Sequence, residues 1–265
     1  MKSTTEMLEL IGRWAERGWL RELDRAFANF LVERAPDAHP LLILAAALAS
    51  HQLGRGHVCL DLDATLADSR FALSLPPEGD SAKDAPELPG VLLDGFDLDG
   101  WRAVLNDPRL VGDGPGETPL VLSGRRLYLR RYWQYEREVR AGIDQRLKQG
   151  EALRAALPAA QLRRALDALF PKKPGNVQTS QGADWQKLAC ALVAGNAFGI
   201  VTGGPGTGKT TTVVKLLALL QSLALEEGGR ALRIRLAAPT GKAAARLNES
   251  IAGAVQRLDL SGLAN

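Results

Sequence analysis

Residues 198–210 read FGIVTGGPGTGKT, and this stretch decides the fold of the C-terminal third of the chain. From Gly203 to Thr210 it satisfies the pattern G-x-x-x-x-G-K-[ST], after a short apolar run and before a helical pattern. Glycines in such a loop let backbone N–H groups turn toward phosphate oxygens, and the start of the next helix adds partial positive charge. The stretch therefore predicts a phosphate-binding loop between a strand and a helix.

The side chains of this loop predict its ligand. Lys209 would reach the β- and γ-phosphates of a nucleotide, and the Thr210 hydroxyl would bind Mg²⁺, so we expect both to be catalytic. An ordinary glycine-rich turn would not require Lys and Thr at these offsets. The residues expected to hold ATP and Mg²⁺ here are Gly203, Gly204, Pro205, Gly206, Thr207, Gly208, Lys209, Thr210 and Thr211.

The segments around the loop alternate between helical and strand patterns. The expected helices are Asp184–Ala194, Thr210–Leu225 and Ala243–Leu258, and the expected strands are Phe198–Val201 and Leu232–Leu236. Such an alternation is typical of a parallel sheet with crossover helices. We therefore expect an α/β fold in residues 181–265.

Gln186 stands seventeen residues before Gly203, at the start of the first of these helices. A side-chain amide donates and accepts at once, so it can pair with the exocyclic amine and a ring nitrogen of adenine. A glutamine on a helix is more often a solvated surface residue. From the local sequence alone, the solvated interpretation is therefore favoured.

A second loop follows the second expected strand, at Pro239, Thr240, Gly241 and Lys242. A hydroxyl, a glycine N–H, a lysine and a helix N-terminus together could bind a phosphate backbone, as of single-stranded DNA. The alternative is a capped helix after a turn. The local sequence does not decide between these two interpretations.

The N-terminal part predicts a mostly helical domain. Helical spacing covers residues 7–18, 23–31, 41–53, 132–148 and 152–169, while 61–116 is rich in Asp, Pro and Gly and predicts loops and short helices. Leu120–Leu122 and Leu127–Leu129 flank Ser123-Gly124 and predict a β-hairpin. The break at Pro171–Asn176 divides the chain into a domain of residues 1–170, a linker of 171–180 and a domain of 181–265.

Composition excludes several classes of protein. The net charge of +3 is small. Residues 201–265 carry +4 and the rest of the chain −1, a distribution that is compatible with phosphate ligands. No apolar run reaches the length of a membrane span and no signal peptide is present, so we expect a cytoplasmic protein without membrane contact. Cys59 and Cys190 should be buried thiols, and the three histidines should serve in the core or as helix caps rather than bind metal.

Arginines alternate with aromatic residues between Arg125 and Arg140, around Tyr128, Tyr132, Trp133 and Tyr135. Such a mixture could be a platform on which nucleic-acid bases stack. We favour a hairpin and helix with buried apolar faces and solvated or paired arginines.

Two segments carry a resemblance to a known family. Gly203 to Val213, together with Arg233 to Leu247, resembles the RecD helicases of superfamily 1. His39-Pro40, Gly56 to Leu60 and Leu127 to Trp133 resemble the N-terminal domain of the alpha subunit of bacterial exodeoxyribonuclease V. The resemblance covers nearly the whole chain and is weakest between residues 63 and 116.

This resemblance implies a RecA-like motor domain that moves 5′ to 3′ on single-stranded DNA, driven by ATP and Mg²⁺. It also implies a heterotrimer with RecB-like and RecC-like subunits, active in double-strand break repair and recombination, in which the N-terminal domain docks on the scaffold subunit. It assigns Gln186 to adenine, Gly206, Gly208, Lys209 and Thr210 to phosphates and Mg²⁺, and Pro239 to Lys242 to the DNA backbone.

One element of the family pattern is missing. No apolar strand ending in Asp-Glu follows Thr210, and Glu226-Glu227 lie beside Gly228-Gly229 in an expected loop. We therefore expect the 265 residues to hold a motor truncated before that strand and inactive in hydrolysis. The alternatives are a non-catalytic module that binds nucleotide and docks on a partner, and a small-molecule kinase, against which the Pro239–Lys242 pattern argues.

Overall fold

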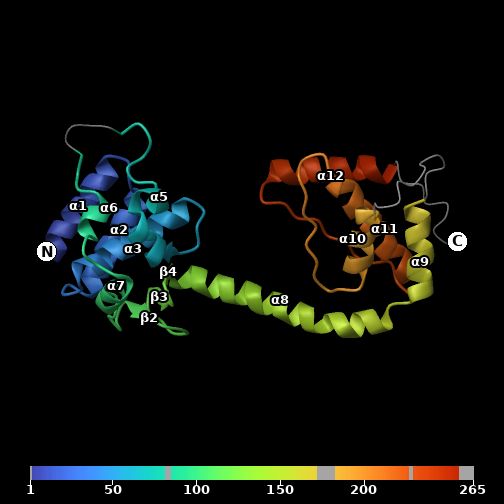
Figure 1. The fold of residues 1–265 in the computed structure, drawn as a ribbon, viewed down its shortest axis with the longest axis horizontal. Coiled ribbons are helices and arrows are strands. Elements are labelled where there is room, and N and C mark those ends of the chain that lie inside the picture. The colour runs from blue at the N-terminus through green and yellow to red at the C-terminus, as the bar shows by residue number, and fades with distance from the viewer. Residues whose placement is uncertain (1, 81–84, 172–182, 227–228, 257–265) are drawn as a thin grey trace. The chain divides into compact units, whose positions relative to one another are not determined.

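The computed structural model describes residues 2–80, 85–171, 183–226 and 229–256, which form two compact units. Unit 1 comprises Met1–Val139 and unit 2 comprises Arg140–Asn265. Most described residues are helical, and the strands form one small mixed sheet in unit 1 (Figure 1). The structure thus confirms the helical N-terminal region with its hairpin within an α/β chain.

Three helices, which the sequence predicted, form the core of unit 1: α1 (Thr4–Glu16), α2 (Glu22–Arg34) and α3 (Pro40–Gly54). Ser3 caps α1 in a reciprocal capping box with Glu6, and His39 Nδ1 accepts a hydrogen bond of 3.2 Å from Leu41 N at the start of α3. Residues 41–52 of α3 are all buried, which explains why this helix is apolar on every face. His39 is therefore a capping residue, as expected.

A buried carboxylate joins α2 to α3. Asp24 is fully buried; its Oδ1 accepts hydrogen bonds of 2.6 Å from Arg21 Nη2 and 2.6 Å from Ser50 Oγ. Arg21 Nη2 also donates to the Ser50 carbonyl, at 2.5 Å. Removal of Arg21 would leave the Asp24 carboxylate as a buried charge without its cation, which costs ~3–5 kcal/mol.

The sheet of unit 1 has the strand order β1-β4-β3-β2. The predicted hairpin consists of β3 (Leu120–Ser123) and β4 (Arg126–Leu129), which pair antiparallel around Gly124 at φ 60°. Two short strands that the sequence did not predict complete it: β1 (Leu60–Asp61), antiparallel to β4, and β2 (Val111–Gly112), parallel to β3. The buried Leu120 and Leu127 join the sheet to the helical core.

The predicted loops and short helices between Asp61 and Gly116 are present. They include α4 (Leu62–Ala67), α5 (Ser69–Leu73), α6 (Pro89–Leu92) and α7 (Leu98–Val104). Asp61, Asp68 and Asp97 cap α4, α5 and α7, each through a side-chain oxygen. Aspartate caps thus explain why an Asp-rich stretch forms short helices rather than one long one.

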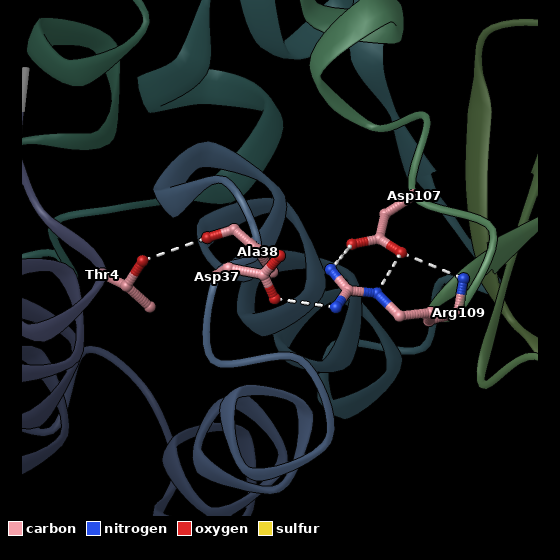
Figure 2. Close-up of polar contacts among 5 residues, drawn as sticks. All are labelled: Thr4, Asp37, Ala38, Asp107 and Arg109. Carbon is pink, nitrogen blue, oxygen red and sulfur yellow. Dashed lines mark hydrogen bonds and ion pairs between the residues drawn. The ribbon is translucent and has the colours of Figure 1, made fainter.

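A charge cluster secures the loop after α7 (Figure 2). Arg109 Nη2 donates to Asp107 at 2.7 Å, and its Nη1 donates to Asp37 at 2.7 Å, in the turn between α2 and α3. Nearby, Thr4 Oγ1 donates to the Ala38 carbonyl at 3.0 Å. These bonds hold the loop and the N-terminal helix to the turn that begins α3.

Unit 2 is built from helices. Helix α8 (Arg130–Ala156) begins in unit 1 and continues into unit 2, followed by α9 (Ala159–Leu169), α10 (Trp185–Ala194), α11 (Lys209–Glu226) and α12 (Gly241–Gln256). The core lies among α9, α10 and α11 and includes Leu166, Cys190 and Leu219. Within the described residues, no helix combines the length and apolar character that a bilayer crossing requires.

Two details of unit 2 differ from the sequence predictions. Phe198–Val201 and Leu232–Leu236 form no strand, because neither backbone pairs with another extended segment in the described part of the chain. Instead, Leu232 N donates to Gln221 Oε1 at 3.1 Å. Residues 140–169 also belong with unit 2, since α9 packs on α10 and α11; most of the expected linker at 171–180 lies outside the described residues.

Candidate functional site

The predicted phosphate loop, Gly203 to Gly208, leads directly into α11, which begins at Lys209. Gly206 and Gly208 have φ of 75° and 80°, values that side-chain-bearing residues rarely adopt. No atom lies within 4 Å of a Cβ built on Gly206, whereas one on Gly208 would collide with Gln186 Nε2. A glycine is therefore needed at both positions for backbone conformation, and a side chain at position 208 would also displace the Gln186 amide.

The loop is closed by its own side chains. Lys209 Nζ donates to the carbonyls of Gly203 and Gly204, at 2.6 Å each, and Thr207 Oγ1 donates to Gly204 O at 2.9 Å. No carboxylate pairs with Lys209 within the described residues. The ammonium group thus donates to two carbonyl oxygens of the loop. A bound phosphate would take the place of these oxygens as its acceptor.

Helix α11 begins where the loop ends. Thr212 N donates to Gly208 O at 2.9 Å, and Thr212 Oγ1 donates to the same oxygen at 3.1 Å. Lys209 and Thr210 therefore stand in the first turn, where backbone N–H groups have no helical partner. Such a turn fits the negative charge of a phosphate.

Gln186 lies against this loop from the neighbouring helix. Asp184 caps α10 by accepting from Gln186 N and Lys187 N, which fixes the first turn. The Gln186 amide then donates to Thr207 O across 3.4 Å. The structure therefore brings together Gln186 and the phosphate loop, residues that the sequence placed seventeen or more positions apart.

The packing of α10 on α11 holds these two parts in place. Cys190 is fully buried and its Sγ donates to Thr212 O at 3.5 Å, in the first turn of α11. Burial raises the pKa of this thiol to about 11, so it stays protonated at neutral pH. The sequence predicted a buried thiol but not its position directly behind the phosphate loop.

The second predicted loop forms the start of α12. Ala243 N donates to Thr240 Oγ1 at 3.2 Å, and Ala244 N donates to Thr240 O at 2.9 Å. Pro239, Thr240, Gly241 and Lys242 are all exposed. Thr240 is thus a helix cap, one of the two interpretations that the sequence left open, while the exposed lysine and helix N-terminus are compatible with the other, binding of a phosphate backbone.

The chain is similar to known proteins over most of its length. Residues 16–128 match the family described as RecBCD enzyme subunit RecD, N-terminal domain, and residues 186–259 match a family described as AAA domain. The RecBCD enzyme subunit RecD of Haemophilus influenzae is 34% identical over 94% of this chain and 38% of its own length.

Two further relatives extend this result. The RecBCD enzyme subunit RecD of Mycolicibacterium smegmatis is 37% identical over 91% of this chain and 36% of its own length. The ATP-dependent RecD2 DNA helicase of Deinococcus radiodurans is 51% identical over 57 residues, which is 22% of this chain. The chain thus spans little more than a third of the RecD subunits that it matches.

Proposed function

We propose that this chain binds ATP and belongs to an ATP-dependent helicase that processes DNA ends. The proposal starts from its similarity to the RecD subunits of RecBCD enzymes. The similarity covers the N-terminal domain family and the nucleotide-binding family. The finer properties that the resemblance implies, 5′ to 3′ movement on single strands and a role in double-strand break repair, are part of the same proposal.

The phosphate loop is the observation that carries this proposal. Its left-handed glycines, the first turn of α11 and Lys209 together form a cradle for phosphate oxygens. Residues Gly203 to Thr211 would hold ATP, with Thr210 on Mg²⁺, an ion that neutralises charge on the phosphates when it is bound. Lys209 would leave the two carbonyls and move to the β- and γ-phosphates.

Gln186 would choose the base. Its amide lies beside the loop rather than in solvent, and its weak 3.4 Å bond to Thr207 O is easily exchanged for a bond to a ligand. An amide that donates and accepts matches the edge of adenine. We assign Gln186 to recognition of ATP over GTP.

The exposed N-terminus of α12 would contact single-stranded DNA. Lys242 and the partial positive charge of the helix N-terminus would attract a phosphate, and Pro239, Thr240 and Gly241 would shape the approach. Residues 140–265 hold 17 Lys and Arg against 8 Asp and Glu, a net charge of +9. This charge favours a polyanion on unit 2.

Unit 1 would serve a different purpose, docking on RecB-like or RecC-like subunits. Residues 1–139 hold 16 Lys and Arg against 22 Asp and Glu, a net charge of −6, which disfavours DNA. Its described residues contain no group of three or more potential metal ligands. The second candidate function is non-catalytic: unit 1 docks on a partner and unit 2 binds nucleotide, but these 265 residues do not hydrolyse it.

Calorimetry with Mg·ATP and Mg·ADP tests the nucleotide site. The wild-type chain should bind, and Lys209→Ala should abolish measurable binding because the phosphates lose their only side-chain ammonium in the loop. Lys148→Ala, on the exposed surface of α8, is the matched control and should bind as the wild type does. Equal affinities of the Lys209→Ala variant and the wild type would refute the site.

A further inference from the structure

Trp185 is the first residue of α10 and stands directly before Gln186, the residue that we assign to the base of the nucleotide. Its side chain is 73% exposed. Tryptophan is highly buried on average in folded proteins, so this exposure leaves its indole ring available to a ligand. The other aromatic residues in the described part of unit 2, Phe170 and Phe198, are buried or half-buried. Trp185 is therefore the exposed aromatic surface of that part.

The local structure holds Trp185 and Gln186 at the same end of α10. The Asp184 side chain accepts hydrogen bonds of 3.1 Å from Gln186 N and 3.0 Å from Lys187 N, which fixes the first turn of the helix. Side chains on a helix tilt toward its N-terminus, and consecutive residues are about 100° apart around its axis. Trp185 and Gln186 therefore leave the N-terminal end of α10 in neighbouring directions.

The contact of Gln186 relates this end of the helix to the phosphate loop. Its amide donates to Thr207 O across 3.4 Å, and its Nε2 stands where a side chain on Gly208 would begin. A nucleotide with its phosphates in the loop and the edge of its base on the Gln186 amide therefore has that base at the N-terminal end of α10. Trp185 offers the face of an aromatic ring at this end.

The packing of α10 leaves Trp185 free for such a contact. Cys190 faces α11, and Lys187 forms an ion pair with α9. By the period of the helix, Trp185 lies on the face away from both, together with Leu188 and Leu192, which are 41% and 61% exposed. This face could instead contact a protein, and Leu192 provides the means to separate the two uses.

We propose that Trp185 is the platform on which the base of the nucleotide stacks, while Gln186 binds the edge of the same base. The proposal rests on the proposed nucleotide site and adds a second base-binding residue to it. An aromatic ring stacks on any base, since every base has a π face, whereas a hydrogen-bonding amide distinguishes one base from another. Trp185 therefore contributes affinity, and Gln186 contributes the choice of base.

Calorimetry with Mg·ATP, Mg·GTP and Mg·tripolyphosphate, which has no base, tests this division. Trp185→Ala should weaken the binding of ATP and of GTP by at least about fivefold each, because base stacking is lost. Tripolyphosphate contacts the loop alone, so its binding should not change. Trp185→Phe keeps an aromatic ring and should retain most of the affinity. Leu192→Ala, about two turns along the same face, is the matched control and should bind all three ligands as the wild type does.

Fluorescence gives an independent readout, because a base stacked on an indole quenches its emission. ATP should quench the wild type, tripolyphosphate should not, and Trp185→Phe should lose the quenching. Unchanged ATP affinity in Trp185→Ala would overturn the proposal and leave Trp185 to a protein contact. An equal loss of affinity for tripolyphosphate would also overturn it, since Trp185 would then support the loop rather than the base. A wild type that binds neither ATP nor tripolyphosphate would refute the nucleotide site itself, and the stacking with it.

Discussion

The role of Lys209 as a phosphate-binding residue could be predicted from sequence, but its contacts in the structure without a nucleotide could not. The spacing from Gly203 predicts a lysine that reaches phosphates, and the structure places it in the loop at the start of α11. Its hydrogen bonds to Gly203 O and Gly204 O follow from backbone geometry, which no pattern of residue types encodes. The proposed nucleotide binding would exchange these two internal hydrogen bonds for contacts with phosphate oxygens.

Replacement of Gln186 tests the choice of base. Gln186→Ala should lower the preference for ATP over GTP by about two- to tenfold, because a net hydrogen bond contributes ~0.5–1.5 kcal/mol. Competition of each nucleotide with a fluorescent ADP analogue measures the ratio. Gln161→Ala, on α9, serves as the control, and a ratio that Gln186→Ala leaves unchanged would reduce Gln186 to a structural contact of the loop.

At the scale of single elements, the helices were the most predictable part. The apolar spacing of α1, α2 and α3 and the turn at Gly124 gave these elements nearly at their observed bounds. Strands β1 and β2 could not be predicted, since two residues are too few to show an alternating pattern. β1 pairs with β4, which is distant in the sequence, whereas β2 pairs with the nearby β3.

For residues 232–236 the sequence predicted a strand that the structure does not contain. Leu232, Ile234 and Leu236 alternate with arginines as a strand does, but a strand needs a neighbour for its backbone groups. The alternating pattern therefore predicted a strand for which the described part of the chain offers no pairing partner. Sequence alone was also insufficient at Thr240, because a helix cap and a DNA contact favour the same residue types.

The Arg109 cluster makes unit 1 sensitive to acid. Hydrogen bonds from Arg109 hold the pKa of Asp107 and of Asp37 below the ordinary value for a carboxyl group. The stabilisation is therefore complete above the ordinary aspartate pKa of ~3.9 and is lost as pH falls through the lowered values. Arg109→Leu should lower the melting temperature at pH 7, and this difference should shrink toward pH 2.5.

Fluorescence of the buried Trp14 and Trp101 follows this melting. Arg102→Leu removes a longer ion pair of 3.5 Å within α7 and provides the control, with a smaller effect at pH 7. Since Arg109 and Asp37 are largely exposed, added salt should also reduce the effect of Arg109→Leu. A pH-independent difference would mean that packing of the arginine, rather than its charge, stabilises the loop.

The N-terminus of α12 yields a prediction about DNA. Binding of the chain to an oligo(dT) strand should weaken with salt, with a log–log slope of about −0.7 for each phosphate neutralised. Lys242→Ala should make this slope shallower by roughly 0.7, measured by fluorescence anisotropy at several salt concentrations. Lys148→Ala should leave the slope unchanged, and equal slopes for the wild type and Lys242→Ala would leave α12 with a cap and no DNA contact.

At the scale of the whole molecule, the two units differ in charge and in the role proposed for each. Unit 1 at −6 contains the complete sheet and the largest buried core, while unit 2 at +9 holds the proposed ligand sites. The sequence predicted a helical and a nucleotide-binding part. It did not predict that residues 140–169 pack with the second part, because α9 has the same amphipathic pattern whichever core it covers.

Hydrolysis of ATP by residues 1–265 should not exceed background. In the described part of unit 2, Glu226 lies 3.5 Å from Arg164 and no carboxylate contacts the phosphate loop, so nothing there orients an attacking water. Phosphate release measured with and without oligo(dT) checks this expectation. Turnover that disappears in the Lys209→Ala variant would show that a catalytic acid acts from a residue not recognised here.

Leu232, Ile234 and Leu236 remain 44%, 44% and 42% exposed, on a stretch whose backbone pairs with no strand among the described residues. Leu232 N donates to Gln221 Oε1, but none of the stretch's backbone groups takes part in a strand ladder among the described residues. Alternate apolar side chains on a backbone without a ladder form an edge to which a foreign strand can add. Two copies that meet at this edge satisfy each other's backbone and bury the same three side chains. A high concentration of the chain therefore favours aggregation through this stretch. Arg233 and Arg235 alternate with the three apolar residues, and repulsion between the arginines of two copies opposes this association.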